Sequence, residues 1–226
     1  MTDVLHITKA DLDADGYYAA AASLEYDGSV EIDADLGRVG FRAMVAVKGY
    51  LWARAGSGIE AGSGIEAGGG IEAGEGIKAG WGIKAGEGIE AGEGIEAGSG
   101  IKAGSGIKAG KGIEAGWGIK AGEGIEAGKG IEAGSGIEAG LTISCTKILH
   151  AKFSIYAGVV TWRKPMPQDR IIRAAVVEGT VEFGTVELVA EPKQEAVVVA
   201  PSQFTPEQVD EIARIAVKAI SREIAK

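Results

Sequence analysis

Apolar and charged residues alternate in a pattern that repeats every six positions between Ile59 and Gly140. Each unit reads Ile-(Glu/Lys)-Ala-Gly-x-Gly; thirteen copies are complete and a fourteenth ends in Leu141-Thr142. In an extended backbone, Ile and Ala face one side and the charge between them faces the other. The Gly-x-Gly that follows suits a change of direction, because Gly reaches positive φ easily and lets neighbouring backbone pass closely. So short a repeat predicts an all-β fold, a β-solenoid in which each hexad supplies one strand and one corner.

The hexad pattern continues beyond the perfect copies. Apolar residues hold the Ile position for three further hexads on each side, at Phe41, Val47, Ala53, Ile143, Leu149 and Ile155. The sequence therefore predicts a hexad-repeat solenoid over residues 41–161. Residues 1–40 are less regular, and we expect them to form the first coils and an amino-terminal cap, since a bare solenoid end is an edge that invites aggregation.

The number of hexads in one coil is less clear from the sequence. Outward residues one coil apart are cross-strand neighbours, and opposite charges are favoured there. Among the charges from Glu60 to Glu138, pairing each with the hexad two further on gives 8 opposite pairs of 12, whereas pairing three further on gives 6 of 11. The charges thus favour two hexads per coil and a flat, two-sided ribbon, with three hexads per coil as the alternative.

The hexad pattern breaks at Trp162–Pro167, where two prolines cannot donate to a strand ladder. The residues that follow are rich in β-formers, with Gly179 and Gly184 as turns, and predict a carboxyl-terminal β cap over residues 162–190. Residues 191–204 show no period and suggest a linker.

Residues 205–226 predict an amphipathic α-helix. Thr205 is a suitable N-cap, Pro206 fits the first helical position, and Gln208 completes a capping box. One face is apolar and has no second predicted helix to cover it, so we expect it to mediate docking or homo-oligomerisation; its residues are Val209, Ile212, Ala213, Ala216 and Ile220.

Composition and charge limit the cellular location that the sequence predicts. The chain has 226 residues, a net charge of -9 and no apolar run near the ~18 residues needed for a membrane span. Residues 1–15 lack the basic-then-apolar pattern of a secretory signal. Cys145 is the only cysteine, which fits a reducing compartment. We therefore expect a cytoplasmic protein that does not contact membranes.

Catalytic chemistry is not indicated. The period resembles that of hexad-repeat acyltransferases and gamma-class carbonic anhydrases, which use loop histidines as a base or as zinc ligands. This chain has only His6 and His150, and its small residue follows the aliphatic one instead of preceding it. Cys145 holds an inward position with no base nearby in sequence. We expect no enzyme activity, no metal and no cofactor, and treat a transferase relative as the least favoured alternative.

The sequence supports a binding surface better than it supports a catalytic site. Trp81 and Trp117 occupy the variable fifth position six hexads apart, a whole number of coils for either two or three hexads per turn, so they should share one edge. Exposed Trp on a rigid surface can anchor a partner. The candidate interaction surface comprises Trp81, Trp117, Glu75, Glu87 and Glu93. Nucleic acid is disfavoured, because residues 59–140 hold 13 Glu against 7 Lys.

Two resemblances extend this interpretation. Residues 24–190, with the hexads followed by Ile155-Tyr156-Ala157-Gly158 and Trp162–Pro165, resemble Gly/Ile hexad proteins of bacteriophages and mobile elements. That resemblance brings no established activity and suggests only a phage-like origin, from which we expect a protein that binds a bacterial host protein, as an inhibitor or a recruiter. Residues 28–58 resemble bactofilin-type polymer-forming solenoids, which implies the alternative of a self-assembling scaffold.

Overall fold

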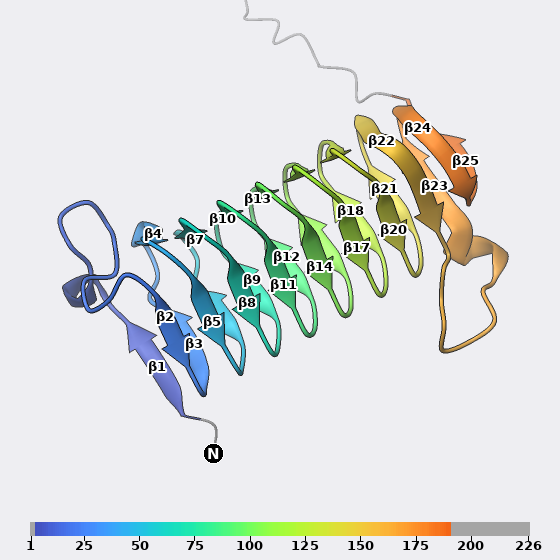
Figure 1. The fold of residues 1–226 in the computed structure, drawn as a ribbon. Coiled ribbons are helices and arrows are strands. Elements are labelled where there is room, and N and C mark those ends of the chain that lie inside the picture. Colours follow the sequence, from blue (N-terminus) through green and yellow to red (C-terminus); the bar gives the residue numbers. More distant parts are fainter. Residues whose placement is uncertain (1–2, 191–226) are drawn as a thin grey trace, which may run out of the picture. The chain divides into compact units, whose positions relative to one another are not determined.

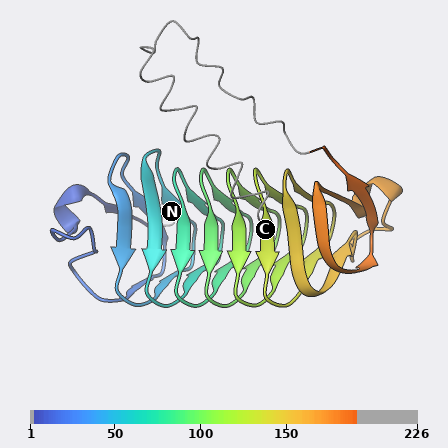
Figure 2. The same cartoon turned by 90° about the horizontal axis from the view of Figure 1, so that it is seen from above.

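The computed structural model describes residues 3–190, and these form a three-sided β-solenoid (Figure 1). A short strand recurs in every hexad, and each strand pairs in parallel with the strand three hexads further along the chain: Ile59 lies opposite Ile77, and Ile77 opposite Ile95. One coil therefore contains three hexads, one on each face. Strands of successive coils lie side by side along each face (Figure 2).

The prediction of two hexads per coil is wrong. With three hexads per coil, like charges face each other at several positions, for example Lys84 opposite Lys102 and Glu96 opposite Glu114. An exposed ion pair contributes only about 0–1 kcal/mol. Burial of an Ile side chain and the backbone hydrogen bonds of every strand contribute more, so the surface charges do not decide the number of sides.

The strands fall into three faces. The first face is a 10-stranded sheet of β1 (Val4–Ile7), β3 (Ser29–Ile32), β6 (Leu51–Ala53), β9 (Ile71–Ala73), β12 (Ile89–Ala91), β15 (Ile107–Ala109), β18 (Ile125–Ala127), β21 (Ile143–Cys145), β23 (Ile171–Ala174) and β25 (Thr185–Leu188). The second face contains β4 (Gly37–Phe41), β7 (Ser57–Ala61), β10 (Ile77–Ala79), β13 (Ile95–Ala97), β16 (Ile113–Ala115) and β19 (Ile131–Ala133). The third contains β2 (Leu24–Tyr26), β5 (Val45–Val47), β8 (Ile65–Ala67), β11 (Ile83–Ala85), β14 (Ile101–Ala103), β17 (Ile119–Ala121) and β20 (Ile137–Ala139).

The second and third faces join at one strand. β22 (Ile148–Ala157) turns the corner without interruption, pairing with β19 through Leu149 and with β20 through Ile155. β24 (Val176–Phe183) pairs with β22 along both halves. The solenoid therefore does not end at residue 161 as the prolines suggested. Its parallel ladder continues through β23, β24 and β25, because the Pro-containing segment bulges out of the coil as a loop with a short 3-10 helix, η2 (Pro167–Arg170).

The first coils are longer than the regular ones. Val30 pairs with Leu51 and Val45 with Ile65, and both intervals are wider than the one between Ile59 and Ile77. Between β1 and β2 an excursion carries a second 3-10 helix, η1 (Lys9–Asp11). The predicted hexad register of residues 41–58 is wrong by two residues: Phe41, Val47 and Ala53 lie opposite Ala61, Ala67 and Ala73, so they hold the Ala position. The Ile position belongs to Val39, Val45 and Leu51, because the wider intervals of these coils shift the strands against a strict count of six. The predicted linker and amphipathic helix, residues 191–226, lie outside the described residues.

The interior is a single column of Ile and Ala. In the hexads from Ile59 to Ala139, every Ile is 1% exposed or less and every Ala 6% or less, whereas the residue between them faces outward. The predicted inward face of each strand is therefore confirmed. Because the column is uniform from coil to coil, the hexads differ from one another only at their outward positions.

The hexad glycines are required by close packing between coils. Among the described residues, positive-φ glycines are confined to six sites outside the regular hexads, at Gly16, Gly37, Gly56, Gly158, Gly179 and Gly184. At the fourth hexad position, a Cβ on Gly104 would lie 1.9 Å from the carbonyl oxygen of Gly86. At the sixth position the same addition is looser, 3.3 Å from Gly124 O for Gly106. Positive φ at the corners, expected from the sequence, is therefore not the reason for these glycines.

Candidate binding surface

The outward residues form straight rows, because each lies above its equivalent in the next coil. Second-position residues make one row on each face, and fifth-position residues make one row along each of the three edges. Adjacent members of a row are about 4.7–4.9 Å apart, the spacing of hydrogen-bonded strands. The chemistry of a row is thus read by stepping three hexads at a time.

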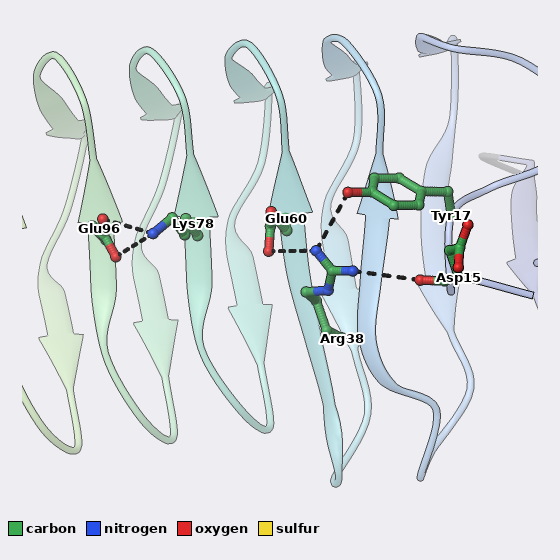
Figure 3. Close-up of polar contacts among 6 residues, drawn as sticks. All are labelled: Asp15, Tyr17, Arg38, Glu60, Lys78 and Glu96. Atoms are coloured by element: carbon green, nitrogen blue, oxygen red, sulfur yellow. Dashed lines mark hydrogen bonds and ion pairs between the residues drawn. The ribbon is translucent and has the colours of Figure 1, made fainter.

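The second face carries a row that is mainly acidic, and Figure 3 shows its first charged members, Glu60, Lys78 and Glu96. Arg38, which lies opposite Gly58 and outside the row, reaches its first acidic residue: its Nη1 lies 3.1 Å from Glu60 Oε2, and its Nη2 donates to Asp15 O at 3.4 Å. Next, Lys78 Nζ donates to both carboxylate oxygens of Glu96 at 2.8 and 2.9 Å. The hydrogen bond to Glu96 raises the pKa of Lys78, so this lysine stays charged. Alternating charges hold this part of the face in pairs.

Three glutamates then follow on successive coils, Glu96, Glu114 and Glu132, which we call the acidic ladder. Glu96 is paired with Lys78, and Glu132 lies 3.7 Å from His150 Nδ1. Glu114 stands between two like charges. A groove of about 660 Å³ runs along this face and includes the acidic ladder among its lining residues.

The third face carries the opposite charge. Lys84, Lys102 and Lys120 lie on successive coils and form the basic ladder. The charges at its two ends are neutralised, because Lys84 Nζ lies 3.8 Å from Glu66 Oε2 and Lys120 Nζ lies 2.8 Å from Glu138 Oε1. Lys102 makes no ion pair within residues 3–190. Like charges directly opposite each other are destabilising, so this arrangement does not serve the stability of the sheet.

The edge between the second and third faces is aromatic. Trp81 and Trp117 lie in one row as predicted: Ser99 N donates to Trp81 O at 2.8 Å, and Trp117 N donates to Ser99 O at 3.1 Å. Two more steps, through Ser135, reach Phe153, whose N donates to Ser135 O at 3.0 Å. Trp81, Trp117 and Phe153, the aromatic edge, are 69%, 70% and 58% exposed. Serine alternates with an aromatic residue along the whole row.

Sequence reasoning missed Phe153. It lies in Lys152-Phe153-Ser154, where the hexad has lost both glycines and is hard to recognise. The signal was nevertheless present, since Phe153 follows Trp117 by the same six hexads that separate Trp117 from Trp81. The charge ladders were missed for another reason: they become visible only when the coil is known to contain three hexads.

A long groove separates the aromatic edge from the basic ladder. It has a volume of about 1090 Å³, and Trp81 and Phe153 line it on one side while Lys84, Lys102 and Lys120 line it on the other. Between them lie sixth-position glycines, including Gly82 and Gly100. We call this the edge groove. It exists because Gly has no side chain and the next residue, Ile, points inward.

The predicted acidic residues do not join the two tryptophans. Glu75 and Glu93 lie in the row along the edge between the first and second faces, where Glu93 N donates to Glu75 O at 3.2 Å and Glu93 pairs with Lys111. Glu87 lies on the remaining edge, with Gly69 and Ser105 as its neighbours in the row. The five predicted surface residues therefore occupy three different edges, and only the Trp pair and the Glu75–Glu93 pair are brought together.

The chemically reactive residues lie apart from one another. His6 is in β1 and His150 in β22, each within 3.7 Å of one glutamate, Glu31 or Glu132. Cys145 is 5% exposed and faces inward opposite Ala127, and its burial raises the pKa of the thiol. Cys145 is thus a core residue, as predicted. Over residues 3–190, no three His, Cys, Asp or Glu side chains are grouped closely enough to hold a metal ion.

Comparison with known proteins adds no family. No protein-family model, no curated protein and no solved structure matches this chain. Within the described part of the chain, no helix has the length and apolar character to cross a membrane. The class of protein is therefore defined by its fold alone: a three-sided parallel β-solenoid with an aromatic edge.

Proposed function

We propose that this chain is a non-catalytic, rigid binding protein that engages a partner protein along the aromatic edge. The observation that supports the proposal is the even row of Trp81, Trp117 and Phe153, each more than half exposed on a continuous ladder of backbone hydrogen bonds. Exposing three large aromatic rings costs solubility, and aromatic residues dominate the energy of protein interfaces. A rigid backbone also binds with little ordering cost.

The resemblance to phage hexad proteins leads us to propose a bacterial host protein as the partner. The test is affinity capture from a bacterial lysate with three proteins: the natural chain, a Trp81→Ser/Trp117→Ser variant, and Glu87→Ser as a matched control on another edge. We expect one partner to be captured by the natural chain and the control but not by the double variant. Equal capture by all three would remove the aromatic edge from the function.

A self-assembling scaffold is the second candidate, and one observation favours it. β25 pairs with β23 on one side only, and among residues 3–190 no strand covers its other side. Val186 and Leu188 on it are 40% and 69% exposed. An open strand edge can add another strand. Electron microscopy of the purified protein tests this: filaments without a captured partner would favour the scaffold over the binding protein.

The predicted helix of residues 205–226 supplies a separate route to self-association. Its apolar residues have no partner in the sequence, so we propose that it docks in trans as a homo-oligomer contact. Light scattering of the full chain beside a chain ending at residue 191 measures this. The full chain should show a larger mass per particle. Equal numbers of copies per particle for the two chains would exclude the helix as a self-association contact.

A further inference from the structure

We infer that the edge groove binds a polyproline-II segment carrying acidic side chains, laid parallel to the solenoid axis. This inference rests on the proposed function and specifies its partner. Two observations carry it: the spacing of the aromatic edge and the charge of the basic ladder opposite.

The spacing selects the conformation of the ligand. Aromatic residues recur every second coil, and two coils span about 9.4–9.8 Å. A polyproline-II helix has three residues per turn and a rise of about 3.1 Å, so it presents the same side every ~9.3 Å. The mismatch is about 0.3 Å per step. Each turn of such a helix can therefore place one residue at the gap between successive rings, over the serines Ser99 and Ser135.

Other regular peptides fit less well. An extended strand presents one side every ~6.6–6.8 Å, so a residue that met Trp81 would be followed at Trp117 by one facing away. An α-helix returns to the same side every turn of about 5.4 Å, so two turns span about 10.8 Å, and the helix is roughly 2 Å out of register by Phe153. Polyproline-II ligands also bind aromatic-lined grooves elsewhere, because the free peptide is already ordered.

The charge selects the side chains. The basic ladder lies across the edge groove from the aromatic edge, and Lys102 at its centre has only Lys84 and Lys120 as neighbours in the row. An acidic side chain from the ligand would relieve this repulsion. A third of the residues on a polyproline-II helix face each direction, so one side can meet the rings while another meets the lysines.

Single-stranded nucleic acid is the main competitor, since bases stack on aromatic rings and phosphates bind lysine. It is disfavoured by the surrounding charge. Glu66 and Glu138 close both ends of the basic ladder, and the chain has a net charge of -9. A polyanion must pass these carboxylates, whereas a peptide needs only a few acidic groups near Lys102.

The test is titration of the full chain into a fluorescently labelled peptide of repeated Pro-Pro-Glu triplets, followed by anisotropy. Matched probes are Pro-Pro-Lys triplets, which keep the conformation and reverse the charge, and Gly-Ser-Glu triplets, which keep the charge and lose the conformation. Oligothymidylate represents nucleic acid. We expect saturable binding of the Pro-Pro-Glu peptide and affinities at least about tenfold weaker for the other three, the scale of one interface hot spot.

Variants identify the groove. Trp81→Ser removes a ring that lines the edge groove, and Trp117→Ser removes the middle ring of the aromatic edge; each should weaken binding about tenfold. Lys102→Gln should weaken it several-fold and reduce its salt dependence. Glu87→Ser, on another edge, should bind as the natural chain does. Three outcomes would overturn the inference. An unchanged affinity for Trp117→Ser would indicate that the groove binds an extended strand, and tighter binding of oligothymidylate would indicate that it binds nucleic acid. A change of particle mass with Trp117→Ser would indicate that a second copy of this chain occupies the groove. If the edge-dependent partner is captured but no Pro-Pro-Glu peptide binds, this inference fails and the proposed function stands.

Discussion

At the scale of single residues, the two glycines of each corner have different tasks. The fourth-position glycine lies against the carbonyl of the coil before it, and the sixth-position glycine has more room. The sequence alone indicated that both were corners, but it did not show which of them the backbone requires. That distinction depends on the distance between coils, which no residue of one hexad encodes.

Gly104→Ala and Gly106→Ala test this difference within one corner. The added Cβ of Gly104→Ala would lie 1.9 Å from Gly86 O, against 3.3 Å from Gly124 O for Gly106→Ala. We expect the first to lower the free energy of unfolding by roughly 1–3 kcal/mol or more, as overpacking does. The second should stay within about 1 kcal/mol of the natural chain. Denaturant unfolding measures both, and similar losses would contradict the packing account.

Lys102→Glu tests whether the basic ladder serves stability. The change replaces two like-charge neighbours, Lys84 and Lys120, by two opposite ones. We expect a higher melting temperature at low salt, with the gain shrinking as salt screens the pairs. The same variant should lose the acidic peptide. A melting temperature that falls would show that the ladder stabilises the sheet and would remove this argument for a binding role.

At the scale of elements, a loop that departs from the hexad pattern is stabilised by side-chain hydrogen bonds, not by the strand ladder of the repeats. In the loop before β23, Arg163 Nη2 donates to Asp169 Oδ1 at 2.9 Å, and Met166 N donates to Asp169 Oδ2 at 2.6 Å. These bonds let the chain leave the coil and return to pair β23 with β21. The prolines marked the loop in the sequence, but the return to the solenoid depends on this buried carboxylate, which no period could reveal.

The loop should be acid-sensitive. The hydrogen bond from Arg163 holds the pKa of Asp169 below its ordinary 3.8. A lowered folded-state pKa contributes stability above the unfolded value, and that contribution is lost as the pH falls through the folded value. Asp169→Asn should therefore melt at a lower temperature than the natural chain near pH 7, with the difference closing below about pH 3.8. Asp27→Asn, with a side chain that is 87% exposed, is the control and should melt within a degree or so of the natural chain near pH 7. A difference for Asp169→Asn that is constant with pH would contradict this assignment.

At the scale of the solenoid, the inward pattern was predictable and the number of sides was not. Ile and Ala at alternate positions specify a strand with one buried face, whatever the shape of the coil. The coil closes after three hexads through packing among strands, and the only sequence clue to its length, the charge row, reports interactions too weak to decide it. Once the coil is known, the aromatic edge and both charge ladders follow directly from the printed sequence.

A one-hexad insertion tests the coil length and the aromatic edge together. Adding Ile-Glu-Ala-Gly-Ser-Gly after Gly100 shifts every later residue by one face, so Trp117 and Phe153 move to a different edge from Trp81. Adding the same hexad after Gly76 moves all three aromatic residues together and keeps their row intact. Both variants contain the same residues, and hexads are equivalent in the core, where each Ile is 1% exposed or less.

Circular dichroism and melting should therefore be alike for the two insertions, since one hexad adds the same strand and corner at either place. Binding of the Pro-Pro-Glu peptide should survive the insertion after Gly76, which keeps all three rings and all three lysines in register. It should fall at least about tenfold with the insertion after Gly100, which moves Trp81 and Lys84 out of line with the other rings and lysines. Equal binding by both variants would show that the aromatic residues act independently and not as a row. Unfolding of either would show that the coils are not interchangeable, against the uniform core that the three-hexad register describes.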